Sequence, residues 1–230
     1  MERHVTYRPL VNSNSIEMYA PPRLYSLDHV EKLWNSLAYN DSRQYSFTDG
    51  VKWYHPKRYF TSAQDLFEFI RDQNVSDIHV KALDDGREWV IDVDIEADDE
   101  DLLDLKIRVA TETFKNFKGN ISRIMHSGNR GIHVWLRIDK FRIGASKNLR
   151  ERYYQIFVKP ADIRLDRIWP GSFIHSYKSA VESITGTSAD IATLHKLWPT
   201  VDKHVFCTQS QIRAPFSYNY KGQKFSTQLL

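Results

Sequence analysis

Two aspartates separated by one residue, Asp92 and Asp94, form the first pattern in the chain that could do chemistry. They lie in segment 88–96, where apolar and acidic residues alternate as in a half-buried β-strand. Both carboxylates then point to the same side of the pleat, where they repel each other unless a proton or cation lies between them. Mg²⁺ prefers such oxygen ligands. Because Asp-x-Asp is a weak motif, an edge strand with a solvated acidic face remains the alternative interpretation.

A second group of polar residues precedes another alternating segment, 132–138. Ser127, Arg130 and His133 could converge on a phosphate chain, and two glycines within 127–131 would let the backbone approach that ligand closely. The planar guanidinium of Arg130 suits phosphate because its donors form a fork. An ordinary glycine turn before a strand is the alternative interpretation.

A third pattern, in 44–60, intersperses basic residues among aromatic ones. This composition is typical of surfaces that bind single-stranded nucleic acid through phosphate contacts and base stacking. The alternative is a pair of strands whose amphipathic side chains cover the core.

The composition limits what the whole chain can be. Its 230 residues allow one large domain or two small ones, and 41% hydrophobic with 27% charged residues is typical of a soluble globular protein. A net charge of +3 excludes nucleic-acid binding by bulk charge alone. No apolar run is long enough to span a bilayer, so we expect no membrane association. Cys207, the single cysteine, permits neither an internal disulfide nor a cysteine-based zinc site.

The elements that must position these residues follow from hydrophobic spacing. We expect an N-terminal arm over 1–26, helices near 27–38 and 99–117, and a second helix capped by Thr61 or Ser62. A short strand over 78–83 precedes the acidic strand, and 211–222 reads as a strand and a turn. Residues 140–200 are expected to be mostly helical, with Ser188 capping the last helix.

The order of these motifs resembles the archaeo-eukaryotic primase superfamily, the small catalytic subunits of DNA primases. The shared order is an apolar Asp-x-Asp strand, Ser-Gly-x-Arg-Gly-x-His-x-Trp, a further Asp and Arg-x-Pro-x-Ser. The sequence is similar above all to the baculovirus branch, the late expression factor one family, from about residue 27 to 226. The resemblance implies an α+β primase-type catalytic core over 27–230. Its mixed or antiparallel sheet would form an RRM-like half beside an αβ half, with a helical insertion at about 142–197.

The resemblance also implies a role for each matching residue. Asp92, Asp94 and Asp202 would be the catalytic acids and would bind two Mg²⁺ or Mn²⁺ ions, with no zinc. Ser127, Arg130, His133 and Arg213 would bind the triphosphate of the incoming nucleotide. Arg43 matches a basic residue before the first motif and would also belong to the nucleotide-binding site. Asn129 and Asn219 depart from the family pattern, in which an arginine and a histidine are common.

The implied activity is template-directed synthesis of short RNA primers on single-stranded DNA by two-metal nucleotidyl transfer, supporting viral DNA replication and late gene expression. Expected partners are the single-stranded DNA template, NTPs and a viral protein resembling a primase large subunit, in the nucleus of the infected cell. Two alternatives stay open: a primer-extending polymerase of the same superfamily, and a catalytically inactive DNA-binding or transcription accessory protein.

Overall fold

The computed structural model describes residues 24–230, so most of the predicted arm, 1–26, lies outside the described residues. Its last residues belong to the folded protein, because Tyr25 is buried and its hydroxyl donates a hydrogen bond to the Ser76 carbonyl (2.5 Å). None of the helices in the described part of the chain combines the length and apolar composition needed to cross a membrane.

Two four-stranded sheets and a hairpin make up the β structure, and every pair of named strands is antiparallel. The first sheet has the order β2-β1-β3-β7, with strands Trp53–Tyr54, Tyr45–Thr48, Asp77–Val80 and Ile212–Arg213. The second has the order β10-β5-β6-β4, with strands Thr227–Gln228, Ile121–His126, Gly131–Leu136 and Val90–Asp94. The hairpin joins β8 (Tyr218–Asn219) to β9 (Lys224–Phe225).

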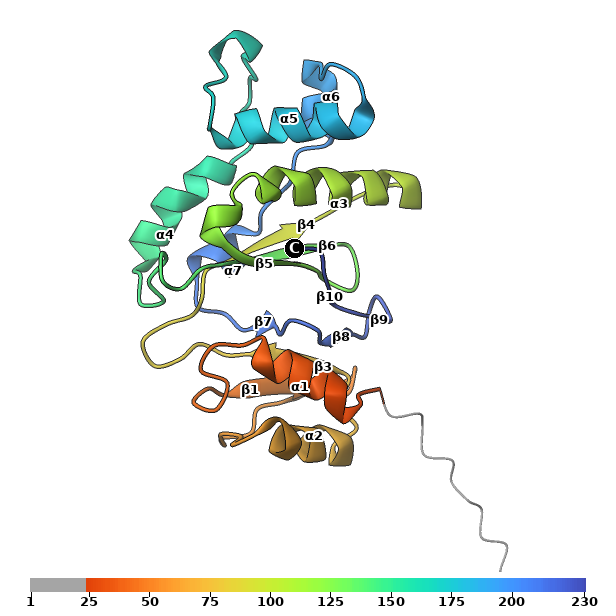
Figure 1. Cartoon of the computed structure of the whole chain (residues 1–230), viewed down its shortest axis with the longest axis vertical. Coiled ribbons are helices and arrows are strands. Elements are labelled where there is room, and N and C mark those ends of the chain that lie inside the picture. The colour runs from red at the N-terminus through yellow and green to blue at the C-terminus, as the bar shows by residue number, and fades with distance from the viewer. Residues whose placement is uncertain (1–23) are drawn as a thin grey trace, which may run out of the picture.

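Helices cover the outer faces of both sheets. They are α1 (Leu27–Asn35), α2 (Ala63–Asp72), α3 (Glu100–Lys115), α4 (Lys147–Tyr154), α5 (Phe173–Thr185), α6 (Ile191–Lys196) and α7 (Lys203–Cys207), with 3-10 turns at Lys118–Asn120, Gln155–Phe157 and Leu165–Arg167. Figure 1 shows α3 on the β4-β5-β6 sheet with α5 and α6 beyond it, while α1 and α2 lie beside the β1-β3 sheet at the opposite end. The fold class is therefore α+β, as the sequence predicts.

The alternation predicted for the acidic strand is confirmed, although β4 has five residues rather than nine. Ile91 and Val93 face α3 in the first apolar core. On the other face of β4 Val90 pairs with Trp135. The next two side chains on that face are Asp92 and Asp94. Val90 and Trp135 pack into the second core, with residues of the other sheet. This face of the second sheet therefore changes from apolar to acidic, with its acidic part beside the gap between the sheets.

The first residues of some helices differ from the predicted ones, because the N-cap residue determines where a helix begins. The helix predicted over 99–117 starts after Asp99, whose side chain accepts from the Leu102 amide at 2.7 Å. Ser62 caps α2, as predicted. The prediction that Ser188 caps α6 is wrong, because Asp190 accepts from the Thr193 amide at 2.7 Å. Aspartate and serine are both good N-caps, so the two sites cannot be distinguished from residue type alone.

The stretch 142–197 contains α4, α5 and α6. It packs on α3, where Ser176 Oγ of α5 donates to the Thr113 carbonyl at 2.8 Å. Tyr177 of α5 in turn donates to the Leu194 carbonyl of α6 at 2.7 Å. These buried bonds attach the helical stretch to the second sheet, and its role as an insertion stays a prediction.

Candidate active site

Three carboxylates that are distant in sequence meet at one point. One oxygen each of Asp92, Asp94 and Asp202 lies within 4.8 Å of the other two. Asp202 reaches this point because Val201 forms a β-bridge with Val93 and the Asp202 amide donates to the Asp92 carbonyl at 2.8 Å. Its side chain also caps α7 by accepting from the Val205 amide at 3.0 Å. Backbone bonds thus hold the third acid against the strand that carries the first two.

The electrostatics of this cluster favour a cation. Burial, together with the neighbouring Asp202, raises the pKa of Asp92 to about 7, and burial and Asp92 raise that of Asp94. An all-oxygen donor set of this kind fits Mg²⁺ or Mn²⁺. Within residues 24–230 this is the single cluster of three or more potential metal ligands. A divalent ion would relieve the repulsion that now favours a bound proton.

His133 lies opposite Asp92 on β6, with its Nε2 3.4 Å from Asp92 Oδ1. Burial and the charge of Arg213 lower the pKa of His133 to about 3. The ring is therefore neutral at physiological pH, and the contact with Asp92 is not an ion pair. A neutral imidazole here can donate one hydrogen bond to an anionic ligand.

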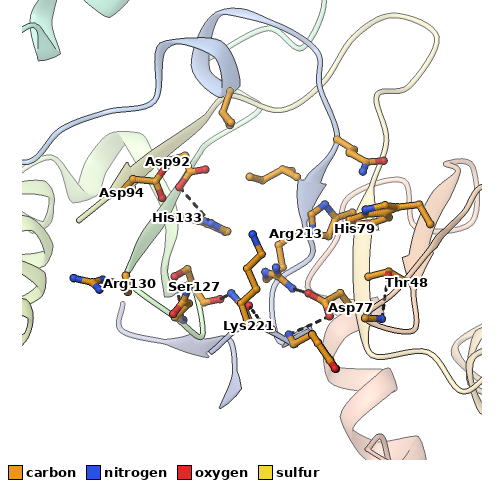
Figure 2. Close-up of a pocket in the computed structure, with 18 of the residues that line it drawn as sticks. Thr48, Asp77, His79, Asp92, Asp94, Ser127, Arg130, His133, Arg213 and Lys221 are labelled. Atoms are coloured by element: carbon orange, nitrogen blue, oxygen red, sulfur yellow. Dashed lines mark hydrogen bonds and ion pairs between the residues drawn. The ribbon is translucent and has the colours of Figure 1, made fainter. Parts of the chain in front are cut away.

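Asp92, Asp94 and His133 form one wall of a cavity of about 490 Å³ between the two sheets, and Asp202 lies behind the two acids. Arg213 of β7 comes from the opposite sheet; its guanidinium bonds the Asp77 carboxylate and donates to the Tyr218 carbonyl at 2.5 Å. Figure 2 shows Arg213 and Lys221 facing His133 across this space. The cavity thus has acids on one side and cations on the other, which suits a metal-bound polyphosphate.

The turn 127–131 joins β5 to β6 beside this cavity. Its glycines serve the backbone itself: a Cβ on Gly131 would lie 2.1 Å from the Val93 carbonyl oxygen, and Gly128 has φ +81°. The expectation that they admit a ligand is therefore replaced by a packing reason, since Gly131 lets β6 pair closely with β4. Ser127 remains at the cavity, as predicted.

Arg130 lines the same cavity as Ser127, His133 and Arg213, but its guanidinium is bonded at the edge of that cavity. Its guanidinium donates to the Ala97 carbonyl at 2.5 Å and is exposed. In Figure 2 Arg130 lies below and to the left of the acids, whereas Arg213 lies to their right. Arg130 lines the cavity but also lines a neighbouring groove that begins at Asp94.

Arg43 lies outside the cavity, so its predicted role in nucleotide binding does not agree with the structure. Its side chain is fully buried and forms an ion pair with Glu88 at 2.6 Å. It also donates to the carbonyls of Ala38 (3.2 Å) and Lys81 (2.9 Å). With both terminal guanidinium nitrogens bonded inside the protein, Arg43 links the segment before β1 to the chain entering β4.

Several residues of the first sheet line the cavity although no sequence motif indicates them. Asp77 orients Arg213, and both ring nitrogens of His79 are buried without a hydrogen-bond partner among the described residues. Trp53 packs edge-on against His79, with ring centroids 4.7 Å apart. The alternation of Asp77, Ile78, His79 and Val80 would have placed the two polar side chains on one face.

Asn219, one of the two departures from the family pattern, has a structural role. Its side-chain amide donates to the Ser127 carbonyl at 3.1 Å, and its oxygen accepts from the amides of Lys221 (3.1 Å) and Gly222 (3.3 Å). Asn219 therefore links the turn after β8 to the turn that carries Ser127. Asn129, the other departure, lines the cavity.

Comparisons with known proteins agree with this geometry. The chain matches no profile of a known protein family. A DNA primase of Autographa californica nuclear polyhedrosis virus is 45% identical over 215 residues, which cover 88% of this chain and 80% of that protein. Late expression factor 1 of Orgyia pseudotsugata multicapsid polyhedrosis virus is 43% identical over 215 residues, covering 89% of this chain and 88% of that protein. Identity at this level over most of both chains shows that this chain belongs to the baculovirus DNA primase and late expression factor 1 family.

Proposed function

We propose that this chain is the catalytic subunit of a viral DNA primase, a nucleotidyltransferase that makes short RNA primers on single-stranded DNA. The observation that carries the proposal is the convergence of Asp92, Asp94 and Asp202, two of which line a cavity together with His133 and Arg213. Membership of the baculovirus primase family supports the same activity.

In the proposed reaction the 3′-hydroxyl oxygen of one nucleotide attacks the α-phosphorus of the next. A P–O bond forms between the hydroxyl oxygen and the α-phosphorus, the bond from that phosphorus to pyrophosphate breaks, and the hydroxyl proton passes to solvent water. Asp92, Asp94 and Asp202 would hold two Mg²⁺ or Mn²⁺ ions, which lower the pKa of the attacking hydroxyl and neutralise the leaving pyrophosphate. Because phosphoryl transfer depends mainly on position and charge, the remaining residues act by holding the triphosphate.

Arg213 is the main cation for that triphosphate. Asp77 and the Tyr218 carbonyl fix its guanidinium at the cavity wall, so little side-chain freedom is lost when an anion binds. Neutral His133 and the Ser127 hydroxyl would donate hydrogen bonds to phosphate oxygens. Because its pKa is about 3, His133 is a hydrogen-bond donor here and does not bring a second positive charge.

The template strand would lie over segment 51–59, next to the cavity. Phe60 is buried, but Lys52, Trp53, Lys57 and Tyr59 are exposed, so these four do not cover the core. Trp53 also lines the cavity. Aromatic faces beside lysines bind single strands by stacking and phosphate contact. The exposed residues of this segment therefore support nucleic-acid binding over the alternative of core cover.

The proposal extends to the setting of the enzyme. We expect a viral partner that resembles a primase large subunit, and action in the nucleus of the infected cell, both on the grounds of family resemblance. Co-purification with that partner and localisation of the tagged chain in infected cells would test these two expectations.

A primer-synthesis assay on single-stranded DNA tests the activity. Wild type should incorporate NTPs without a primer when Mg²⁺ or Mn²⁺ is present, and Asp92→Ala should lose at least about a thousandfold in rate. Asp104→Ala is the matched control, because Asp104 is an exposed acid on α3 paired only with Arg108 at 3.8 Å. Extension of supplied primers without unprimed synthesis would favour the primer-extending polymerase. Metal-independent DNA binding with no incorporation would favour the accessory protein and refute the proposal.

A further inference from the structure

A groove lined by three lysines begins at Asp94, on the side away from Arg213. Two adjoining hollows of about 280 Å³ and 730 Å³ form it, and they share Asp94, Glu96, Lys106 and Lys196. Lys159 lines the smaller hollow, and Arg130 lies where the larger one meets the main cavity. We call the surface formed by Lys106, Lys159 and Lys196 the lysine groove.

The cations of the lysine groove have no charged partners within residues 24–230. None of its three ammonium groups forms an ion pair among the described residues; Lys106 donates to the Glu96 carbonyl at 2.6 Å and Lys159 to the His195 carbonyl at 3.0 Å. Glu96 and Asp98 also line the groove. Setting aside Asp94 as a metal ligand, the three lysines and Arg130 outnumber these two carboxylates. The groove therefore has an excess of positive charge in a concave surface, which favours an anion.

The position of the groove identifies which anion fits it. The attacking and leaving oxygens of phosphoryl transfer lie roughly in line on opposite sides of the phosphorus. If the leaving pyrophosphate lies in the main cavity beside Arg213, the attacking hydroxyl must approach from the opposite side of the acids. In Figure 2 Arg130 lies to the left of the acids and Arg213 to their right, and Arg130 also lines the larger hollow of the lysine groove.

We propose that the lysine groove binds the 5′-phosphates of the nucleotide that supplies the attacking 3′-hydroxyl. This inference rests on the proposed primase function and adds a second nucleotide subsite to it. The ligand is the initiating NTP in the first bond and the end of the growing RNA strand in later ones. Both carry phosphate on the 5′ side of the reacting sugar, so the same lysines serve both.

The test uses the full chain, with its partner if activity requires it, on a template that specifies different bases at the first two positions. The initiating and incoming nucleotides can then be varied separately. The variants are Lys106→Ala, Lys196→Ala and the double variant, with Lys140→Ala as the matched control because Lys140 is exposed and lines neither cavity nor groove. We expect the KM for the initiating nucleotide to rise about tenfold per lysine removed. The KM for the incoming nucleotide should stay within about twofold of wild type.

A second arm separates the two sources of phosphate. Extension of a supplied RNA primer is measured with a 5′-hydroxyl end and with a 5′-triphosphate end. A defect with both primers means that the groove holds phosphodiesters of the strand, and a defect confined to unprimed synthesis means that it holds the triphosphate of the initiating NTP. The first result supports both roles of the groove, whereas the second supports its role in the first bond and overturns its role in later ones.

Other results would overturn it. A rise in the KM of the incoming nucleotide alone would make the groove part of the triphosphate site, and variants matching Lys140→Ala would leave the groove without a role. If wild type makes no product, the proposed function fails. The phosphate subsite is then tested by itself, by fluorescence anisotropy with a labelled 5′-triphosphorylated dinucleotide. Weaker binding in the double lysine variant would keep the phosphate subsite, whereas equal binding would exclude it.

Discussion

Replacement of Asp92 by asparagine should stabilise the metal-free protein at neutral and alkaline pH. Burial and Asp202 raise the pKa of Asp92 from 3.8 to about 7, so the folded state binds a proton more tightly than the unfolded state. The contribution of Asp92 to the free energy of unfolding is therefore complete below about pH 4 and is lost as the pH rises to about 7. Asparagine resembles the protonated carboxyl in shape and is neutral at every pH, so it avoids this loss.

The size of the effect follows from the two pKa values. At about 1.4 kcal/mol for each pH unit between them, the ionised Asp92 costs the metal-free protein about 4 kcal/mol at pH 8. This figure is an upper limit, because the three acids titrate together and the Asp92 side chain is 13% exposed. For a protein of this size, 1 kcal/mol changes the melting temperature by about 2–4 °C. A rise of up to about 16 °C is therefore expected for Asp92→Asn at pH 8, and little change at pH 4.

The assay is thermal unfolding followed by circular dichroism, in EDTA at pH 4 and pH 8, and then with increasing Mg²⁺ or Mn²⁺. Metal should stabilise wild type in proportion to the logarithm of its concentration above Kd, and should have little effect on Asp92→Asn. The control is Asp139→Asn, since Asp139 is exposed and paired with Arg137. The reasoning is refuted if Asp92→Asn is no more stable than wild type in EDTA at pH 8, or if metal stabilises both proteins equally.

Three further predictions concern single residues. Arg213→Lys should raise the KM for the incoming NTP about tenfold or more in steady-state assays, because one ammonium cannot replace the guanidinium held by Asp77 and the Tyr218 carbonyl; an unchanged KM would exclude Arg213 from the triphosphate site. Trp53→Ala should weaken binding of single-stranded DNA in anisotropy titrations by about 5–100-fold, the effect of losing one stacked base. Trp169→Ala, at an exposed tryptophan that does not line the cavity, should leave that affinity unchanged. Arg43→Ala should lower the free energy of unfolding by about 3–5 kcal/mol in denaturant titrations, since it leaves the buried Glu88 unpaired. A change confined to nucleotide affinity would instead support the role first predicted for Arg43.

Local patterns in the sequence were sufficient for the elements that carry the site. Alternation placed Asp92 and Asp94 on one face of a strand because period 2 is a property of the backbone. The N-cap of α2 is predicted at Thr61 or Ser62, and the structure places it at Ser62. A serine followed three residues later by an aspartate has the spacing of a capping box, and the Ser62 side chain accepts a hydrogen bond from the Asp65 amide. These inferences need only neighbours in sequence, which explains why the structure agrees with them.

Arg43 and Arg130 show where such inference fails. An arginine near a motif has the same sequence signature whether it faces a ligand or a buried carboxylate. Glu88, the partner of Arg43, comes from a distant part of the chain, and nothing local indicates that the two meet. For Arg130 the turn 127–131 was identified correctly, but the direction of its side chain depends on the Ala97 carbonyl after β4. Side-chain direction at a turn is set by tertiary contacts that the local sequence does not contain.

Asp202 shows how such a contact can create a site. Asp202 lies beside Asp92 because Val201 forms a β-bridge with Val93 and the Asp202 amide donates to the Asp92 carbonyl. Such backbone bonds do not require particular residue types, so the sequence does not indicate them. The same segment of chain, 196–202, begins with Lys196 of the lysine groove and ends with the third acid. A shift of this segment would therefore move the proposed phosphate subsite and the proposed metal site together. Since in-line attack requires the hydroxyl and the metal to keep a fixed relation, placing both on one short segment bonded to β4 gives the reaction the rigidity that it needs.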